Sequence, residues 1–366
     1  MIIPLIKPYM TEAIKARVAA VLDSGYLTEG PTAHELERIF AAYVGAPYAI
    51  ATSSCTTGLE LALRAVGVGP GDEVIVPDYT YPATASAVAM TGGTPVIVDI
   101  EEDTQLISRS AVEAALSPRT RAICPVSLFG NPLDYHWLNK LKKNREIYII
   151  EDAACSIGAA WNDAKVGSFA DISVFSLHPR KFITTGEGGM ITTSNGLWAE
   201  WMNSFKHFGM SDGSAARKSI RFERMGSNYK LSDIQAAVGL GQMQDIDMLL
   251  TERRAQAALY NDMFASLPGV GLPTVSERGE HSWQTYSIRL DRRDEIMQKM
   301  HAKSIEVQIG TYALHHHPAY QSPACRLCGT FPHSEAAFAR TLALPMYHGM
   351  TQETQEKVFL SLKECL

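Results

Sequence analysis

Ile147-Tyr148-Ile149-Ile150-Glu151-Asp152 is the stretch of sequence that decides the fold. Hydrophobic residues in an unbroken run, followed at once by carboxylates, are typical of a strand buried on both faces of a parallel sheet and ending at a polar edge. Similar apolar runs occur at residues 74–76, 96–98 and 122–124. The run at 147–152 is therefore one of a series.

Helical patterns separate these strands, at residues 55–66, 82–91, 110–116 and 133–143. Alternation of short buried strands with amphipathic helices predicts an α/β fold with a mostly parallel sheet. We predict a large domain over residues 1–240, which includes the N-terminal segment.

The pattern changes after Ser232. We predict one long helix over residues 232–267, a strand at 285–290, and helices at 293–301 and 351–363. These elements predict a smaller C-terminal α+β domain over residues 241–366.

Composition narrows the class of protein. Hydrophobic residues make up 46% and charged residues 20% of 366 residues, as in ordinary globular proteins, and a net charge of −6 argues against a nucleic-acid partner. No apolar run approaches the ~20 residues of a membrane helix. Residues 1–10 are interrupted by Pro4 and Pro8 and carry no basic segment, so we expect no signal peptide. Six cysteines in this length predict a reduced, cytoplasmic protein.

Polar residues follow two of the strands, where open α/β sheets bind ligands. Asp152 ends one strand, and Lys181 lies in a Gly/Thr-rich loop after the strand at 172–175, five positions beyond Ser176. Pyridoxal 5′-phosphate (PLP) requires an Asp at its pyridine nitrogen and a Lys that forms a Schiff base. The alternatives are a helix cap for Asp152 and an ordinary surface lysine for Lys181.

Two further stretches suit the same cofactor. Ser54, Cys55 and Thr56 follow a strand candidate at 48–51 and open a helix, where amides and hydroxyls can bind a phosphate or merely cap the helix. Tyr79 and Tyr81 follow the strand at 74–76; one of them can stack on a flat ring, or both can belong to the core.

The chain also carries a series of motifs in a fixed order. They are Gly25-Tyr-Leu-Thr28-Glu-Gly30-Pro31, Ser54-Cys55-Thr56, Thr80-Tyr81, Glu151-Asp152-Ala-Ala, Phe175-Ser-Leu-His-Pro-Arg-Lys181, Thr185-Gly-Glu-Gly-Gly189, Gly226-Ser-Asn228-Tyr-Lys230-Leu-Ser-Asp233 and Leu342-Ala-Leu-Pro345-Met-Tyr. With these motifs the chain resembles the DegT/DnrJ/EryC1/StrS family of PLP-dependent sugar aminotransferases, of PLP fold type I. The likeness covers nearly the whole chain.

The resemblance implies a role for each matching residue. Lys181 would form the Schiff base and carry the proton, and Asp152 would pair with the pyridine nitrogen. The other cofactor contacts would be Tyr81 on the ring, Ser54, Cys55 (through its backbone), Thr56 and Ser176 on the phosphate, and Cys155 where many members have Gln or His. Asn228 would reach the cofactor of a partner subunit in a homodimer. Thr28, His315 and His317 would contact substrate.

The expected reaction moves an amino group from an amino acid, with glutamate the expected donor, to a keto-sugar. A nucleotide-linked 4-keto-6-deoxy sugar is the expected acceptor. The alternatives are a family enzyme acting on a cyclitol or a non-nucleotide keto-sugar, a sugar dehydratase, and a non-catalytic regulator. Some relatives with dehydratase activity have His in place of the lysine, so Lys181 disfavours that alternative. The complete set of Asp152, Lys181 and Ser176 disfavours the regulator.

Two other clusters stand outside this reading. Cys325-Arg-Leu-Cys328 lacks the second cysteine pair of a structural zinc site, so no metal is predicted. The basic residues Arg217, Lys218, Arg221 and Arg224 predict either a solvated loop or a clamp for a diphosphate.

Overall fold

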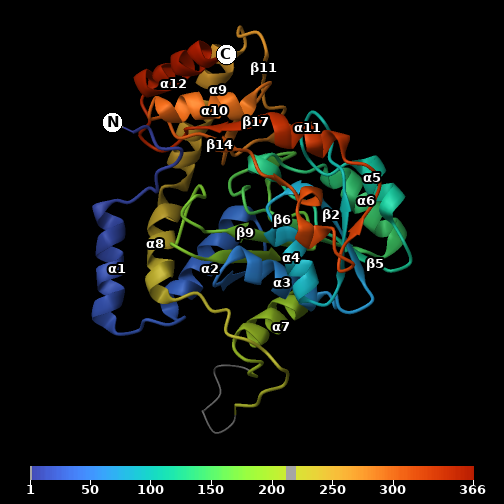
Figure 1. The fold of residues 1–366 in the computed structure, drawn as a ribbon. Coiled ribbons are helices and arrows are strands. Elements are labelled where there is room, and N and C mark those ends of the chain that lie inside the picture. Colours follow the sequence, from blue (N-terminus) through green and yellow to red (C-terminus); the bar gives the residue numbers. More distant parts are fainter. Residues whose placement is uncertain (1, 212–219) are drawn as a thin grey trace.

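An eight-stranded sheet forms the centre of the computed structural model, which describes residues 2–211 and 220–366 (Figure 1). Its strands pair in parallel, except that β10 runs antiparallel to both of its neighbours. In spatial order they are β1 (Tyr48–Thr52), β10 (Gly189–Thr193), β9 (Ile172–Ser176), β6 (Tyr148–Asp152), β5 (Thr120–Ile123), β2 (Glu73–Pro77), β4 (Thr94–Val98) and β16 (Arg326–Leu327). The predicted α/β class is confirmed.

Both faces of this sheet are buried, as its continuous apolar runs predict. Ile75 and Ile149 point into one core cluster, and Val74, Val76 and Ile150 point into the other. The first cluster is covered by α2 (Pro31–Val44), α5 (Arg109–Ala115), α6 (Tyr135–Arg145) and α8 (Asp233–Gln244). The second is covered by α3 (Cys55–Ala65), α4 (Ala83–Met90) and α7 (Gly196–Lys206).

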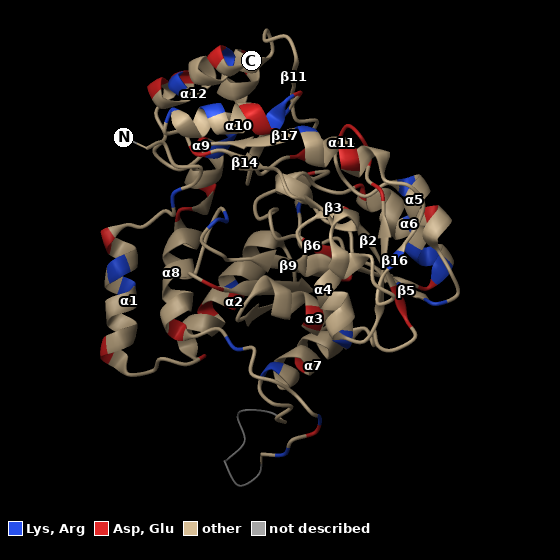
Figure 2. Cartoon of the chain, viewed as in Figure 1, with Lys and Arg blue, Asp and Glu red and all other residues tan. Residues whose placement is uncertain are grey.

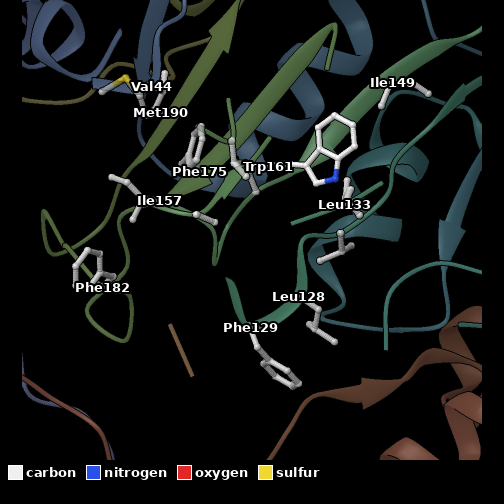
Figure 3. Packing of buried hydrophobic residues seen from close by; sticks show 14 of the residues in the cluster. Val44, Leu128, Phe129, Leu133, Ile149, Ile157, Trp161, Phe175, Phe182 and Met190 are labelled. Carbon is white, nitrogen blue, oxygen red and sulfur yellow. The ribbon is translucent and has the colours of Figure 1, made fainter. Parts of the chain in front are cut away.

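The first cluster is rich in aromatic rings (Figure 3). Phe175 of β9 meets Phe40 of α2 edge to face, with ring centroids 5.0 Å apart. Trp161 packs edge to face on Tyr135, at 5.7 Å. Phe175 directly precedes Ser176 on β9, and the Tyr135 hydroxyl donates to Glu151, the neighbour of Asp152 on β6.

A second, antiparallel sheet has a core of its own. Its order is β11 (Val270–Gly271), β13 (Tyr286–Leu290), β17 (Thr341–Leu344) and β14 (Gln308–Ile309), and it packs with α9 (Ile246–Phe264), α10 (Arg293–Ala302) and α12 (Gln352–Cys365). Two further helices are α1 (Glu12–Ser24) and α11 (Pro332–Arg340). Short strands form a two-stranded sheet of β3 (Tyr79–Thr80) and β15 (Tyr312–Ala313), and a three-stranded sheet of β12 (Gly279–Glu280), β7 (Ala160–Trp161) and β8 (Ala164–Lys165). The 3₁₀ turns are η1 (Leu128–Gly130), η2 (Leu314–His316) and η3 (Pro318–Tyr320).

The single long helix predicted over residues 232–267 is wrong. The structure has two helices, α8 and α9, which meet at Asp245, whose φ of −103° and ψ of 7° lie outside the helical range. The Asp245 carboxylate accepts a hydrogen bond from the Tyr9 hydroxyl at 2.9 Å, so a partner far away in sequence holds the break. Periodicity continues through the break, and therefore did not reveal it.

The first residues of the chain pair with the second sheet's layer, although the prediction placed the whole N-terminal segment in the large domain. Ile3 forms a parallel bridge with Ile305, and Leu5 O accepts a hydrogen bond from Met346 N at 3.0 Å. The boundary between residues 240 and 241 stays a prediction. Within the described part of the chain, no helix combines the length and apolar character needed to span a bilayer.

Candidate active site

A cleft of about 680 Å³ opens at the carboxyl ends of the parallel strands. One wall of the cleft is formed by the large sheet. The opposite side is formed by Leu5 and Ile6 and, in and beside the second sheet, by residues 308–312, Ala343 and Leu344. The predicted cofactor residues Ser54, Cys55, Thr56, Tyr81, Asp152, Cys155, Ser176 and Lys181 all line this one cleft. The fold thus brings together segments that lie far apart in sequence.

Asp152 ends β6 and is only 4% exposed. Its carboxylate accepts hydrogen bonds from Thr84 Oγ1 at 2.7 Å and from Ala154 N at 3.2 Å. Burial raises the pKa of Asp152, and these hydrogen bonds only partly oppose the rise. A cation in the cleft would stabilise its charged form. Residues 153–156 form a turn rather than a helix, so Asp152 is not a helix cap here.

Glu151 points to the opposite face of β6, as strand alternation requires. It is fully buried and accepts hydrogen bonds from the Tyr135 hydroxyl at 2.6 Å, the Ser173 hydroxyl at 2.8 Å and the Ser127 hydroxyl. Burial raises the pKa of Glu151 as well. Its side chain lies in the core, whereas that of Asp152 faces the cleft.

Lys181 lies in the loop after β9, with Nζ 3.1 Å from Cys155 Sγ. Burial disfavours the ammonium, but the adjacent Cys155 sulfur and the more distant Cys55 and Asp152 outweigh burial and raise the pKa of Lys181. Lys181 is therefore not an ordinary surface lysine, since it lines the cleft and contacts Cys155.

Gln284, which the sequence did not single out, holds the lysine loop in place. Its side chain accepts a hydrogen bond from Phe182 N and donates one to Arg180 O at 2.7 Å, so it grips the residues on both sides of Lys181. Gln284 lies two residues before β13 and more than a hundred residues along the chain from the lysine loop, and no local signal marks it. Thr84 was not predicted either, because its partner Asp152 lies far away in sequence.

The turn before α3 is compatible with both interpretations of residues 54–56, a helix cap and a phosphate site. Ser54 caps the helix, accepting from Thr57 N at 3.1 Å, while Thr57 Oγ1 accepts from Ser54 N at 3.1 Å. The first-turn amides of a helix lack intrahelical acceptors and favour anions. A Cβ on Gly189 would lie 2.6 Å from Ser54 O, so this glycine lets β10 approach the turn closely.

The two tyrosines divide between core and cleft. Tyr79 is fully buried and its hydroxyl accepts from Thr311 N at 3.3 Å. Tyr81 is 64% exposed, with its ring centroid 6.2 Å from that of Tyr312 across the cleft wall. Tyr81 is therefore the ring available to a flat ligand.

The other predicted site residues lie outside the lining of this cleft, within the described structure. Thr28 and Asn228 are exposed, and the Asn228 side chain accepts a hydrogen bond from Lys230. The ring of His315 is bound to Asp78 and Glu335. The ring of His317 lies 5.7 Å from Tyr312, which does line the cleft.

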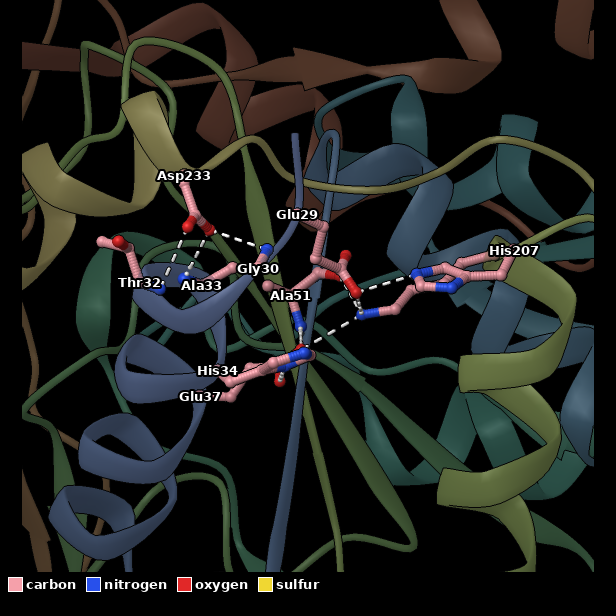
Figure 4. A network of polar contacts seen from close by, with 10 residues as sticks. Glu29, Gly30, Thr32, Ala33, His34, Glu37, Ala51, His207 and Asp233 are labelled. Atoms are coloured by element: carbon pink, nitrogen blue, oxygen red, sulfur yellow. Dashed lines mark hydrogen bonds and ion pairs between the residues drawn. The ribbon is translucent and has the colours of Figure 1, made fainter. Parts of the chain in front are cut away.

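A buried charge network lies beside Thr28 (Figure 4). Lys206 is 1% exposed; its Nζ lies 3.1 Å from Glu29 and 3.1 Å from Glu37, and it donates to Ala51 O at 3.1 Å. Glu29 also pairs with His207 at 2.8 Å. Since Ala51 belongs to β1, the network steadies the strand that leads into the Ser54 turn.

The clusters left open by the sequence resolve in different ways. Cys325 packs against one face of the main sheet and Cys328 against the other, so they do not converge on one ion. Arg217 and Lys218 lie outside the described residues. Arg224 lies over the Trp201 ring at 5.7 Å. Lys and Arg are interspersed with Asp and Glu along the helices (Figure 2).

The donor set of the cleft fits PLP. It offers an amine at Lys181, a buried carboxylate at Asp152, an exposed ring at Tyr81, and hydroxyls and helix amides at Ser54, Thr56 and Ser176. These are the groups needed for the aldehyde, the pyridine nitrogen, the ring face and the phosphate of that cofactor.

Fold and cleft together define a PLP-dependent aminotransferase. The chain belongs to the DegT/DnrJ/EryC1/StrS aminotransferase family, whose sequence profile matches residues 8–363. It is 35% identical over 360 residues to the spore coat polysaccharide biosynthesis protein SpsC of Bacillus subtilis, covering 95% of this chain and 92% of that protein.

Solved structures agree with this assignment. DesV of S. venezuelae, in complex with a ketimine intermediate, is 32% identical with a TM-score of 0.91, covering 99% of this chain and 98% of that one. The PLP form of Spr1654 from Streptococcus pneumoniae is 29% identical with a TM-score of 0.93, covering 100% and 98%. The predicted fold, enzyme class and cofactor are confirmed.

Proposed function

We propose that this enzyme transfers an amino group from glutamate to a nucleotide-linked 4-keto-6-deoxy sugar. The observation that carries the proposal is the joint placement of Lys181, Asp152 and Ser176 in one cleft. The relation to SpsC, a spore coat polysaccharide biosynthesis protein, supports a sugar as the acceptor and a surface polysaccharide as the destination.

The proposed roles of the residues follow from their positions. When bound, PLP supplies an electron sink for the carbon that loses a proton. Lys181 Nζ moves that proton, since its amine lines the cleft together with Asp152. Asp152 keeps a positive charge opposite its carboxylate, and Thr84 orients that carboxylate.

We also propose that the site is completed in a cytoplasmic homodimer. Asn228 is exposed and lies outside its own cleft lining, which supports a contact with the partner's cofactor. All six cysteines are free, as expected in a reducing compartment.

A substrate panel tests the proposed reaction. Purified PLP-loaded enzyme would receive glutamate with keto-sugar nucleotides, free keto-sugars or a keto-cyclitol, and products would be identified by mass and NMR. We expect amination of a keto-sugar nucleotide and loss of turnover in a Lys181→Ala control.

Other outcomes of the panel would contradict the proposal. Loss of water from the sugar without amination would indicate a dehydratase. Amination of the cyclitol or of a free sugar alone would move the acceptor class. A yellow protein that undergoes no half-reaction with glutamate or any other amino acid would indicate a regulator.

A further inference from the structure

Metal-ligating side chains gather beside the cleft wall, where η2 meets α11. His315 Nε2 and His316 Nε2 each lie 3.1 Å from Glu335 Oε2. One ligand atom from each of the three residues falls within 4.8 Å of the others. Tetrahedral zinc with bonds of about 2.0–2.1 Å separates its ligand atoms by about 3.3–3.4 Å. Both measured edges are close to that spacing.

A buried carboxylate orients the first of these histidines. Asp78 is fully buried, and its two oxygens lie 2.7 Å from His315 N and 2.7 Å from His315 Nδ1. The His315 ring also stacks on Phe331, with centroids 4.7 Å apart and planes 11° apart. In the neutral tautomer in which Nδ1 donates to Asp78, the Nε2 lone pair is available to a metal ion beside Glu335. Carboxylate, histidine and metal in series are a recurrent arrangement in metal sites.

The second cluster of ligand-type side chains in the described structure, Glu29, His34 and Glu37, differs in a decisive way. The ammonium of Lys206 already lies 3.1 Å from both carboxylates and fills the place of a cation. Around Glu335, the partners of the carboxylate are imidazoles, which bind metal once they are neutral.

We propose that His315, His316 and Glu335 bind a divalent ion of the zinc class. Glu335 is 59% exposed, so water can take the fourth position. The ion would fasten α11 to the turn that follows Tyr312, a residue of the cleft wall, without entering the cleft. The site is independent of which sugar the enzyme uses.

Titration of the PLP-loaded enzyme with Zn²⁺ and with Co²⁺ tests this site. We expect one saturable site per chain by calorimetry. Co²⁺ should give the visible bands of a tetrahedral nitrogen and oxygen site, without the sulfur charge-transfer band that a cysteine site would add. His316→Ala and Glu335→Gln, both on exposed side chains, should each weaken binding by at least about 100-fold.

His333→Ala is the matched control, because His333 is a partly exposed histidine on the same helix, two residues before Glu335. It should leave the affinity unchanged. The proposal is overturned if Zn²⁺ shows no saturable binding, if Co²⁺ reports sulfur ligands, or if His316→Ala binds as tightly as the unaltered enzyme. None of these readouts depends on amino-group transfer.

Discussion

Glu151 and Asp152 are adjacent buried carboxylates, and their partners decide what each can do. Asp152 shares the cleft with Lys181, and Thr84 Oγ1 holds it at 2.7 Å. Glu151 is surrounded by hydroxyls in the core. One carboxylate is therefore available to a cofactor, whereas the other serves the fold.

Asp152→Asn should keep the fold but lower kcat of the glutamate half-reaction by a factor on the order of 100 to 1,000, the usual effect of losing one electrostatic contact at a reacting group. The amide keeps the shape and loses the charge. Thr84→Val, which removes only the orienting hydroxyl, should lower kcat about tenfold. Stopped-flow absorbance measures both rates, and a near-normal kcat in Asp152→Asn would refute the role.

Lys181→Ala should abolish turnover, because it removes the amine that binds the cofactor and moves the proton. The purified variant should also lose the absorbance of lysine-bound PLP. Lys165→Ala is a suitable control, since Lys165 is a partly exposed lysine outside the cleft. Normal turnover and an unchanged spectrum in Lys181→Ala would disprove the assignment.

Glu151→Gln tests the cost of the buried carboxyl. Burial raises the folded-state pKa of Glu151 above its ordinary value of about 4.3, so the folded state binds the proton more tightly. The contribution of Glu151 to the free energy of unfolding is fully present below about pH 4.3, and it is lost as pH rises through the folded-state pKa. The free energy of unfolding of wild type, minus that of Glu151→Gln, should fall with rising pH in urea titrations. A rising difference would show that the hydroxyl donors outweigh burial.

Among the secondary-structure elements, those with a local signal were predictable from the sequence and those fixed by distant contacts were not. The strands of the large sheet can be recognised as continuous apolar runs because both faces of the sheet are buried, as at residues 147–152. The break at Asp245 depends on Tyr9, and the lysine loop depends on Gln284. Both partners lie too far away in sequence for periodicity to detect.

The Lys206 network joins the end of α7 to α2 and β1, so its loss should destabilise all three. Lys206→Met leaves Glu29 and Glu37 buried without their ammonium, which should cost about 3 to 5 kcal/mol in the free energy of unfolding. Lys15→Met is the control: its pair with Glu12 is exposed and should contribute less than about 1 kcal/mol. Urea denaturation measures both, and equal effects would contradict the buried pairing.

The same network carries a pH signature. Burial opposes ionisation of Glu29 and Glu37, but their hydrogen bonds and the charge of Lys206 outweigh it and lower the pKa of each. Their contribution is present above the ordinary carboxyl pKa and is lost as pH falls through the folded value. The cost of Lys206→Met should therefore shrink towards acid pH.

For the whole molecule, the question is whether one chain holds a complete site. We expect that it does not, and that Asn228 serves the partner. Mixing Lys181→Ala with Asn228→Glu should give mixed dimers in which one site carries both lesions and the other neither. Half the dimers are mixed, so activity should recover to at most about a quarter of wild type.

Subunit exchange must be shown independently, for example with two differently labelled variants. No recovery despite proven exchange would place Asn228 in its own subunit's site. Asn228 could be predicted only from its place in the family motifs, since an exposed asparagine before a helix carries no signal of its own.

The pairing of the N-terminal residues has a consequence for how the chain is made. Leu5 N donates to Glu306 Oε2 at 3.0 Å across 301 positions of sequence, and Leu5 and Ile6 line the cleft. On the ribosome, the strands of the large sheet other than β16, which all end by Thr193, can assemble while synthesis continues, since domains fold as they emerge. Ile3 and Leu5 form these hydrogen bonds only after residues 304–306 and 346 have been made. This wall of the cleft thus contains residues that are translated about 300 positions before the residues that complete it.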